Sequence, residues 1–193
     1  MGDSGVALGT LGDIGVALSH AVLCVTSLGC ALRARELTGG PAAGFLLQAL
    51  VAATDAMSPL MSPLMSPRPP TAVPNVPEAP SSSWICSVVA QPLVAFGCHR
   101  LSGDNATANV LLVTSAAVAS VALWWPGRVP PCHFVTALTV ASLLALAALT
   151  GGGTAAVAAA LVALGDVVAP AGVPWVRVAA SVALLGTMRD MRR

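Results

Sequence analysis

Seven apolar runs follow one another along the sequence and limit the folds it can adopt. They lie at about 14–32, 42–57, 84–98, 108–125, 133–150, 154–169 and 174–188. Each is about 15 to 19 residues long, close to the roughly 20 that a helix needs to cross a bilayer core. Runs such as FVTALTVASLLALAALT have no charged side, whereas a surface helix of a soluble bundle carries a polar face. The pattern therefore favours helices that span a membrane.

The charge content leads to the same conclusion. Only 9% of the residues are charged and 56% are hydrophobic, whereas a soluble domain carries about 25% charged residues. The runs are rich in Ala and Leu and do not alternate strictly, which favours helices over a membrane β-barrel. We expect an all-α, polytopic helical membrane protein with about seven short transmembrane helices; a count of six to eight fits the same runs.

Proline marks a break between the second and third runs. Eight of the 15 prolines lie within 57–83, a segment that also contains Met-Ser-Pro-Leu twice. Such a segment is typical of an extended linker. The sequence predicts an N-terminal segment with two helices (1–57), a Pro/Ser-rich linker (58–83), five helices (84–188) and a basic C-terminal tail (189–193).

Arginine predicts the orientation, because cytosolic loops of membrane proteins carry an excess of positive charge. With seven spans, one side receives Arg33, Arg35, Arg100, Arg189, Arg192 and Arg193. The other side receives Arg68, Arg128 and Arg177. We expect a cytosolic C-terminus and a lumenal linker, which then acts as a connector rather than as a kinase-controlled switch. The short helices suit a thin bilayer such as the endoplasmic reticulum or another endomembrane.

Polar residues inside the apolar runs are candidates for function, since each is costly in lipid. They are His20, Gln48, Asp55, Gln91, Asp166 and Arg177. In a hairpin centred near Leu37, His20 and Asp55 lie at about the same depth and could pair, either to handle protons or to satisfy each other. Asp166 and Arg177 flank the 170–174 turn, where we expect an interfacial ion pair with Arg177 reaching towards the membrane surface.

No catalytic signature of the GxSxG, HExxH or P-loop type occurs. The five cysteines show no CxxC or metal-ligand spacing, so we expect no metal and no cofactor. A net charge of +1 and the absence of Tyr argue against nucleic-acid binding. The expected partners are the lipid bilayer and other membrane proteins. Asn105-Ala106-Thr107 matches a glycosylation sequon, but the orientation places it in the cytosol, where it would stay unmodified.

Three stretches carry a family resemblance: ALSHAVLCVTSLGCAL (17–32), AAGFLLQAL (42–50) and QPLVAFGCHRLSGDNATANVLL (91–112). Together they resemble the vertebrate multi-pass family called transmembrane protein 276, over helices one to four and about half of the chain. The resemblance implies a multi-pass membrane topology and assigns no activity. The Met-Ser-Pro-Leu repeats depart from the family and resemble a lineage-specific insertion.

The favoured function is a non-enzymatic endomembrane protein that serves in an assembly. One alternative is an intramembrane lipid-metabolising enzyme similar to lysoplasmalogenases, suggested by the Gly-Asp pairs Gly103-Asp104 and Gly165-Asp166. Another is a small transporter, which would use discontinuous helices and paired polar sites.

Overall fold

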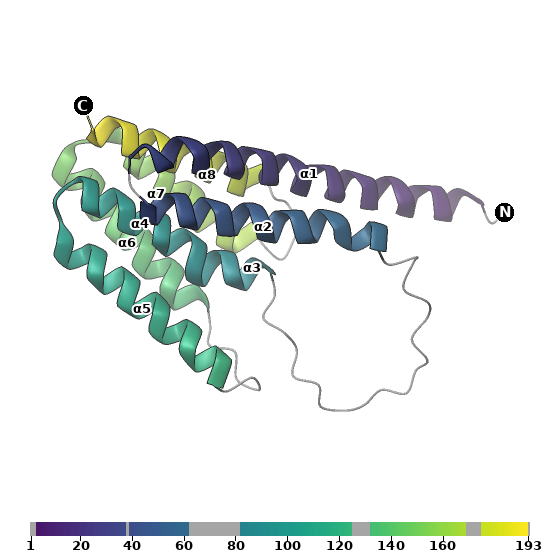
Figure 1. The fold of residues 1–193 in the computed structure, drawn as a ribbon. Helices are drawn as coiled ribbons and strands as arrows, with labels where there is room; N and C mark the ends of the chain where they lie inside the picture. The colour runs from purple at the N-terminus through teal and green to yellow at the C-terminus, as the bar shows by residue number, and fades with distance from the viewer. Residues whose placement is uncertain (1–2, 38, 62–81, 125–131, 169–174, 193) are drawn as a thin grey trace.

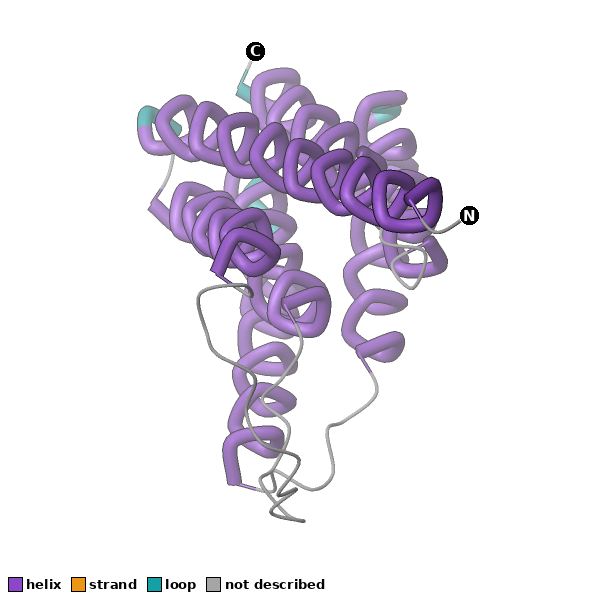
Figure 2. The backbone as a smooth tube through the Cα atoms, turned by 90° about the vertical axis from the view of Figure 1, so that its right-hand side faces the viewer, coloured by secondary structure: helices purple, strands orange, loops and turns teal. Residues whose placement is uncertain are grey.

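The computed structural model describes residues 3–37, 39–61, 82–124, 132–168 and 175–192. These residues fold into helices and contain no strand (Figure 2). The helices are α1 (Asp3–Arg35), α2 (Gly39–Met61), α3 (Ser82–Ile85), a π-helical turn η1 (Cys86–Ala90), α4 (Gln91–Leu101), α5 (Asn105–Trp124), α6 (Cys132–Thr150), α7 (Gly153–Val168) and α8 (Trp175–Met191).

Within the described part of the chain, α3, η1 and α4 run on without a break, so seven helical segments result. The predicted all-α class with about seven helices is therefore confirmed. Three helices are long and apolar enough to cross a membrane, over Ile14–Arg35, Asn105–Ala122 and His133–Thr150. A shorter apolar helix covers Gly153–Val167.

The helices run up and down, so their short turns meet at one end of the bundle. The α1–α2, α4–α5 and α6–α7 turns lie at the same end as the C-terminus, opposite the N-terminus (Figure 1). We call it the arginine-rich end, because the described arginines there are Arg33, Arg35, Arg100, Arg189 and Arg192. Gly103 and Gly151 allow two of these turns, since both adopt positive φ angles, +85° and +66°.

Two helix boundaries differ from the prediction. Helix α1 begins at Asp3, well before the apolar run, and α2 continues to Met61, four residues past the expected end of the second helix at residue 57. Most of the predicted linker, residues 62–81, lies outside the described residues.

Pro92 lies within the third apolar run, and a π-helical turn accommodates it. The Gln91 N–H donates to the Cys86 carbonyl five residues earlier. Because Pro92 has no N–H, the Val88 carbonyl lacks the donor that an α-helix would provide. The buried Ser115 hydroxyl of α5 donates to that carbonyl. A neighbouring helix thus satisfies the backbone group that proline frees, as a lipid environment requires.

Helices α2 and α4 cross at very small side chains. A Cβ atom built on Gly97 would lie 1.8 Å from Cγ of Pro41, and one on Gly44 would lie 2.8 Å from the Ala90 carbonyl oxygen. Phe45, Val94, Ala95 and Cys98 are buried around this crossing. Close backbone approach through small residues is the usual way in which membrane helices pack, because lipid gives them no hydrophobic reason to associate.

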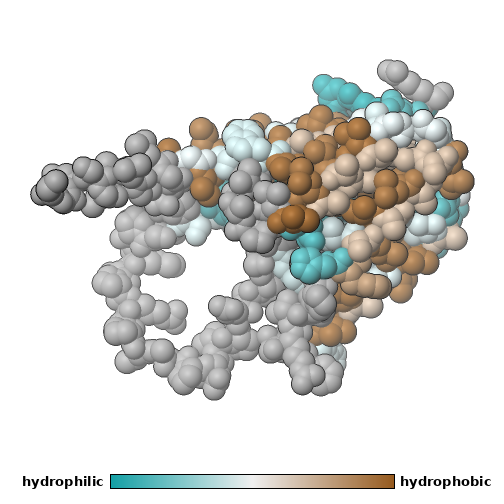
Figure 3. Space-filling model, turned by 180° about the vertical axis from the view of Figure 1, so that it is seen from behind, coloured by the Kyte–Doolittle hydropathy of each residue, from teal (hydrophilic) through white to brown (hydrophobic). Residues whose placement is uncertain are grey.

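The outer surface of the bundle is apolar. Large side chains such as Val25, Val113 and Leu149 are 71%, 67% and 82% exposed, and apolar residues cover much of the described face in Figure 3. A water-soluble protein rarely exposes so much contiguous apolar surface. The surface is that of a protein surrounded by lipid.

Candidate functional site

Each of the three histidines of the chain lies beside an aspartate. Nδ1 to Oδ2 distances are 3.7 Å for His20–Asp55, 3.4 Å for His99–Asp104 and 2.7 Å for His133–Asp166. Two of the pairs join neighbouring antiparallel helices, and the third spans the α4–α5 turn. In the described residues, no group of three or more His, Cys, Asp or Glu side chains is arranged to hold a metal ion.

His20 and Asp55 meet across the α1–α2 hairpin. The two side chains are 15% and 25% exposed. Their 3.7 Å separation is longer than an ordinary hydrogen bond, and His20 Nδ1 is buried without a hydrogen-bond partner. The contact is therefore electrostatic when the imidazole is protonated and weak when it is neutral.

Cys86 of η1 and Arg177 of α8 are also buried. Arg177 is only 8% exposed and shares the inward face of α8 with Ser181 and Leu184. His20 and Asp55 form the polar contact between α1 and α2, and Arg177 is a buried polar residue of α8.

The predicted pair of Asp166 with Arg177 is not what the structure contains. Asp166 pairs with His133 of α6 at 2.7 Å, while Arg177 points into the bundle instead of towards the membrane surface. The reason is helical phase: residues 177, 180, 181 and 184 lie on one side of α8 and are all buried. The distance of Arg177 from the connecting turn predicted how deep it lies in the bundle. It did not predict which side of α8 carries it.

His133 and Asp166 border an apolar groove on the outside of α6 and α7. His133 is 76% exposed, whereas Asp166 is 13% exposed. The groove has a volume of about 380 Å³. Its lining comprises His133, Thr136, Ala137, Val140, Ala141, Leu144, Ala163, Asp166 and Val167. We call it the α6–α7 groove.

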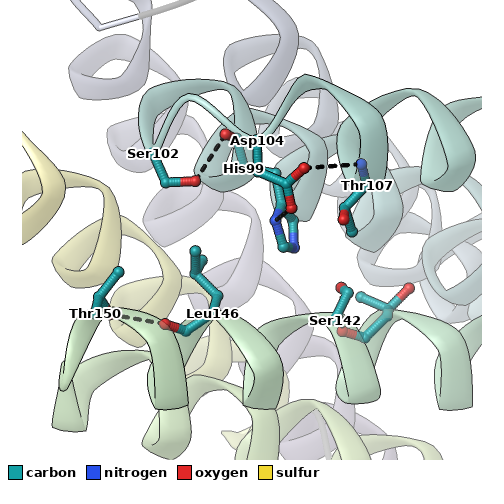
Figure 4. Close-up of polar contacts among 8 residues, drawn as sticks. His99, Ser102, Asp104, Thr107, Ser142, Leu146 and Thr150 are labelled. Carbon is teal, nitrogen blue, oxygen red and sulfur yellow. Dashed lines mark hydrogen bonds and ion pairs between the residues drawn. The ribbon is translucent and has the colours of Figure 1, made fainter.

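His99 is the most deeply buried of the three histidines, with 1% of its surface exposed. Its imidazole points from α4 towards α6, where Ser142 lies (Figure 4). Neither ring nitrogen has a hydrogen-bond partner among the described residues. Ser142 donates to the Thr139 carbonyl of its own helix at 2.8 Å. His99 is thus a buried polar group whose nearest charged neighbour is the Asp104 carboxylate.

Asp104 is first of all a helix cap. Its Oδ1 accepts a hydrogen bond from the Thr107 N–H at 3.1 Å, at the start of α5, and acidic residues are favoured there. The hydrogen bonds from Thr107 lower the pKa of Asp104, and the nearby His99 acts in the same direction. Next to it, Asn105 of the sequon accepts a hydrogen bond from Arg100 at 2.7 Å.

Gln48 and Gln91 are both buried, at 5% and 7% exposure. Gln91 Oε1 has no hydrogen-bond partner within the described part of the chain. It lies at the junction of η1 and α4, next to Pro92, where the helix changes from π to α geometry. The two Gly-Asp dipeptides do not meet: Gly103-Asp104 lies at the arginine-rich end, and Asp166 is 13 residues, or about 20 Å, along α7 from Gly153.

Five of these polar residues share one level of the bundle. They lie 13 to 17 residues from the arginine-rich ends of their helices, or about 20–26 Å at 1.5 Å per residue. The five are His20, Asp55, His133, Asp166 and Arg177. With a hydrocarbon core of about 30 Å, this level falls within the apolar layer, towards the end opposite the arginines.

Two paired histidines, His99 and His133, were not among the residues that the sequence singled out. His99 follows directly after the third apolar run, and His133 opens the fifth. The hairpin argument that gave His20 and Asp55 the same depth also relates His133 to Asp166, because the turn at Gly151–Gly153 reverses the chain between them. His99 and Asp104 are five residues apart across a glycine turn, a spacing that carries no general signal.

Comparison with known proteins gives relatives of one kind. Transmembrane protein 276 from Homo sapiens is 38% identical over 96 residues, covering 50% of this chain and 43% of the human protein. The protein of the same name from Bos taurus is 36% identical over 101 residues, covering 52% of this chain and 46% of its own length. The match thus spans less than half the length of these relatives.

No family model matches the chain, and no solved structure matches it. The resemblance predicted from the helix-one to helix-four motifs is nevertheless confirmed, since curated relatives from four mammals carry the same name. These relatives and the apolar helices identify the chain as an integral membrane protein that is similar, over about half of its length, to transmembrane protein 276.

Proposed function

We propose that the protein is a non-enzymatic component of an endomembrane assembly and that the α6–α7 groove receives a transmembrane helix of a partner protein. The observation that carries the proposal is the groove itself: about 380 Å³ of apolar hollow on the lipid-facing side of two helices. Lipid chains fill a smooth surface well, whereas a groove of this kind offers an added gain in packing to a helix that fits it.

The shape and chemistry of the groove suit a helix. Ala137 and Ala141 are exposed and lie one turn apart on α6, so a partner backbone can approach closely. Phe134 and Leu144, 63% and 49% exposed, provide larger apolar contacts on the same helix. The largely exposed His133 can add a hydrogen bond to a polar group of the partner, a contact that specifies register between membrane helices.

The positions of the polar residues favour this role over the two alternatives. A lipid-metabolising site built on both Gly-Asp pairs would need them together, and they lie about 20 Å apart along the bundle. A transporter of the discontinuous-helix type needs a broken helix, whereas the chain continues through Pro92 in helical geometry.

Site-specific photo-crosslinking in native membranes tests the groove. A photoreactive residue at Leu144, which lines the groove, is expected to give one discrete protein adduct. The same probe at Val113 of α5, 67% exposed, is expected to give only lipid adducts. Ala141→Leu fills the groove and is expected to abolish the Leu144 adduct at unchanged protein abundance, because the added side chain occupies the position of the partner.

Ala117→Leu is the matched control, since Ala117 is an exposed alanine on α5 outside the groove. It is expected to leave the Leu144 adduct intact. An adduct that persists in Ala141→Leu, or lipid adducts alone at Leu144, would contradict the groove as a helix-binding site. Lipid turnover by the purified protein would contradict the non-enzymatic role.

We further propose that the arginine-rich end faces the cytosol of an endomembrane, because five described arginines gather there. A C-terminal tag is then expected to bind antibody after selective permeabilisation of the plasma membrane and to co-localise with an endoplasmic-reticulum or other endomembrane marker. A lumenal epitope on a resident protein serves as the control for intact internal membranes. Protection of the tag until all membranes are opened would reverse the orientation.

A further inference from the structure

We propose that Arg33, Arg189 and Arg192 form a binding site for the phosphate group of an anionic phospholipid. The three residues line one cleft of about 400 Å³ at the arginine-rich end, together with Glu36 and Leu37. The site lies on α1 and α8, away from the α6–α7 groove, and does not depend on the proposed assembly role.

Packing between α1 and α8 brings these arginines together. Arg33 lies in the last turn of α1, and Arg189 lies in the last turn of α8. Below them the two helices are joined by the Cys30 thiol, which contacts the Ser181 carbonyl oxygen at 3.9 Å. Ala34 and Met188 are fully buried in the same core. The cleft is thus held by a packed helix pair rather than by a loop.

The cleft has a surplus of positive charge. Three guanidinium groups line it, and Glu36 is the one carboxylate among its described lining residues. Within the described part of the chain, none of the three arginines forms an ion pair within 4.0 Å. Arg100, by comparison, is engaged by Asn105 and by the ring of Phe96. Arginine binds phosphate oxygens through two parallel N–H groups, so three free guanidinium groups fit a phosphate well.

The surroundings of the cleft select a lipid rather than a free anion. Val25, Leu28 and Leu32 lie on one face of α1 and are 71%, 44% and 60% exposed, leading away from Arg33 along the bundle. Val182 on α8 is 54% exposed. An acyl chain can follow this apolar surface while the phosphate contacts the arginines. Basic clefts between helices at the membrane surface recognise anionic headgroups in the same way.

Binding of fluorescent phosphatidic acid to the purified full-length protein tests the site. The protein is reconstituted in phosphatidylcholine nanodiscs, and the variant carries Arg33→Gln, Arg189→Gln and Arg192→Gln. We expect its affinity to fall by about 100-fold, because each arginine near an anionic headgroup contributes about a factor of five. All three side chains are exposed, so the variant is expected to keep its unfolding temperature in pure phosphatidylcholine.

Arg35→Gln is the matched control, since Arg35 lies in the same turn of α1 and does not line the cleft. It is expected to lower the affinity by no more than about fivefold. An equal loss in Arg35→Gln and in the triple variant would show that only the general surface charge acts and would overturn the site. Displacement of the lipid by millimolar inorganic phosphate would identify a free-anion site and overturn the lipid assignment.

Discussion

Gly97→Ala is expected to destabilise the protein by about 3 kcal/mol and to reduce its abundance sharply. The added Cβ would lie 1.8 Å from Cγ and 2.6 Å from Cδ of Pro41. The proline ring is stiff and sits at the beginning of α2, so relief requires the two helices to move apart. Overpacking a well-packed core costs about 1–3 kcal/mol, and a clash with a stiff ring at this distance belongs at the upper end. Thermal denaturation in detergent and steady-state abundance measure the effect.

Gly186→Ala is the matched control, because a Cβ there meets no atom within 4 Å. This change is expected to leave stability unchanged or to raise it by up to about 1 kcal/mol through helix propensity. Combining Gly97→Ala with Pro41→Ala removes the ring atoms that clash and is expected to recover part of the loss. Wild-type stability in Gly97→Ala alone would show that α2 and α4 are further apart at this crossing than the 1.8 Å between the added Cβ and Pro41 Cγ implies.

The Gly97–Pro41 contact shows what the sequence could not provide. Apolar runs and glycine- or proline-rich breaks predict how many helices exist and where they turn, since these depend on local composition. Which glycine meets which partner depends on the rotation and tilt of two helices about their axes. Gly97 and Pro41 are 56 positions apart, and the Pro-rich segment separates them in the sequence.

For the candidate residues, the sequence predicted the depth in the bundle better than the side of the helix on which each residue lies. Counting from Leu37 was enough to give His20 and Asp55 the same depth, because a short turn fixes the register of an antiparallel hairpin. The same counting around the 170–174 turn failed for Arg177. Counting residues gives depth only, whereas each residue of a helix is also rotated by about 100° from the one before it. This rotation directs Arg177 towards the inside of the bundle, and Asp166 pairs with His133 instead.

The π-helical turn Cys86–Ala90 was not predicted from the sequence. A proline removes one donor, and how the backbone responds depends on which neighbour can satisfy the freed carbonyl. Here that neighbour is Ser115, 23 positions after Pro92.

The His20–Asp55 pair gives the other large expected effect. His20→Leu is expected to destabilise the protein by about 2 kcal/mol, because it leaves Asp55 without the imidazole that lies 3.7 Å away. An unpaired Asp at a helix centre in lipid costs about 2.5–3.5 kcal/mol, and less where it is partly exposed. Asp55 is 25% exposed, which places the effect below that range. Thermal denaturation and abundance of the membrane-inserted protein are the measurements.

Adding Asp55→Leu to His20→Leu is expected to restore abundance, since no charge then remains without its partner in the hairpin. Thr54→Val is the control for a change beside Asp55, because the Thr54 hydroxyl donates a hydrogen bond to the Val51 carbonyl of its own helix.

Recovery in the double variant would support the structural interpretation of the pair, in which the two polar side chains satisfy each other inside the bundle. A double variant that is abundant and still forms the partner adduct at Leu144 would show that assembly does not require the pair. If it is abundant but has lost that adduct, the pair contributes to function as well as to stability. Wild-type abundance in His20→Leu and in Asp55→Leu alike would mean that the two side chains do not interact, contrary to their 3.7 Å contact.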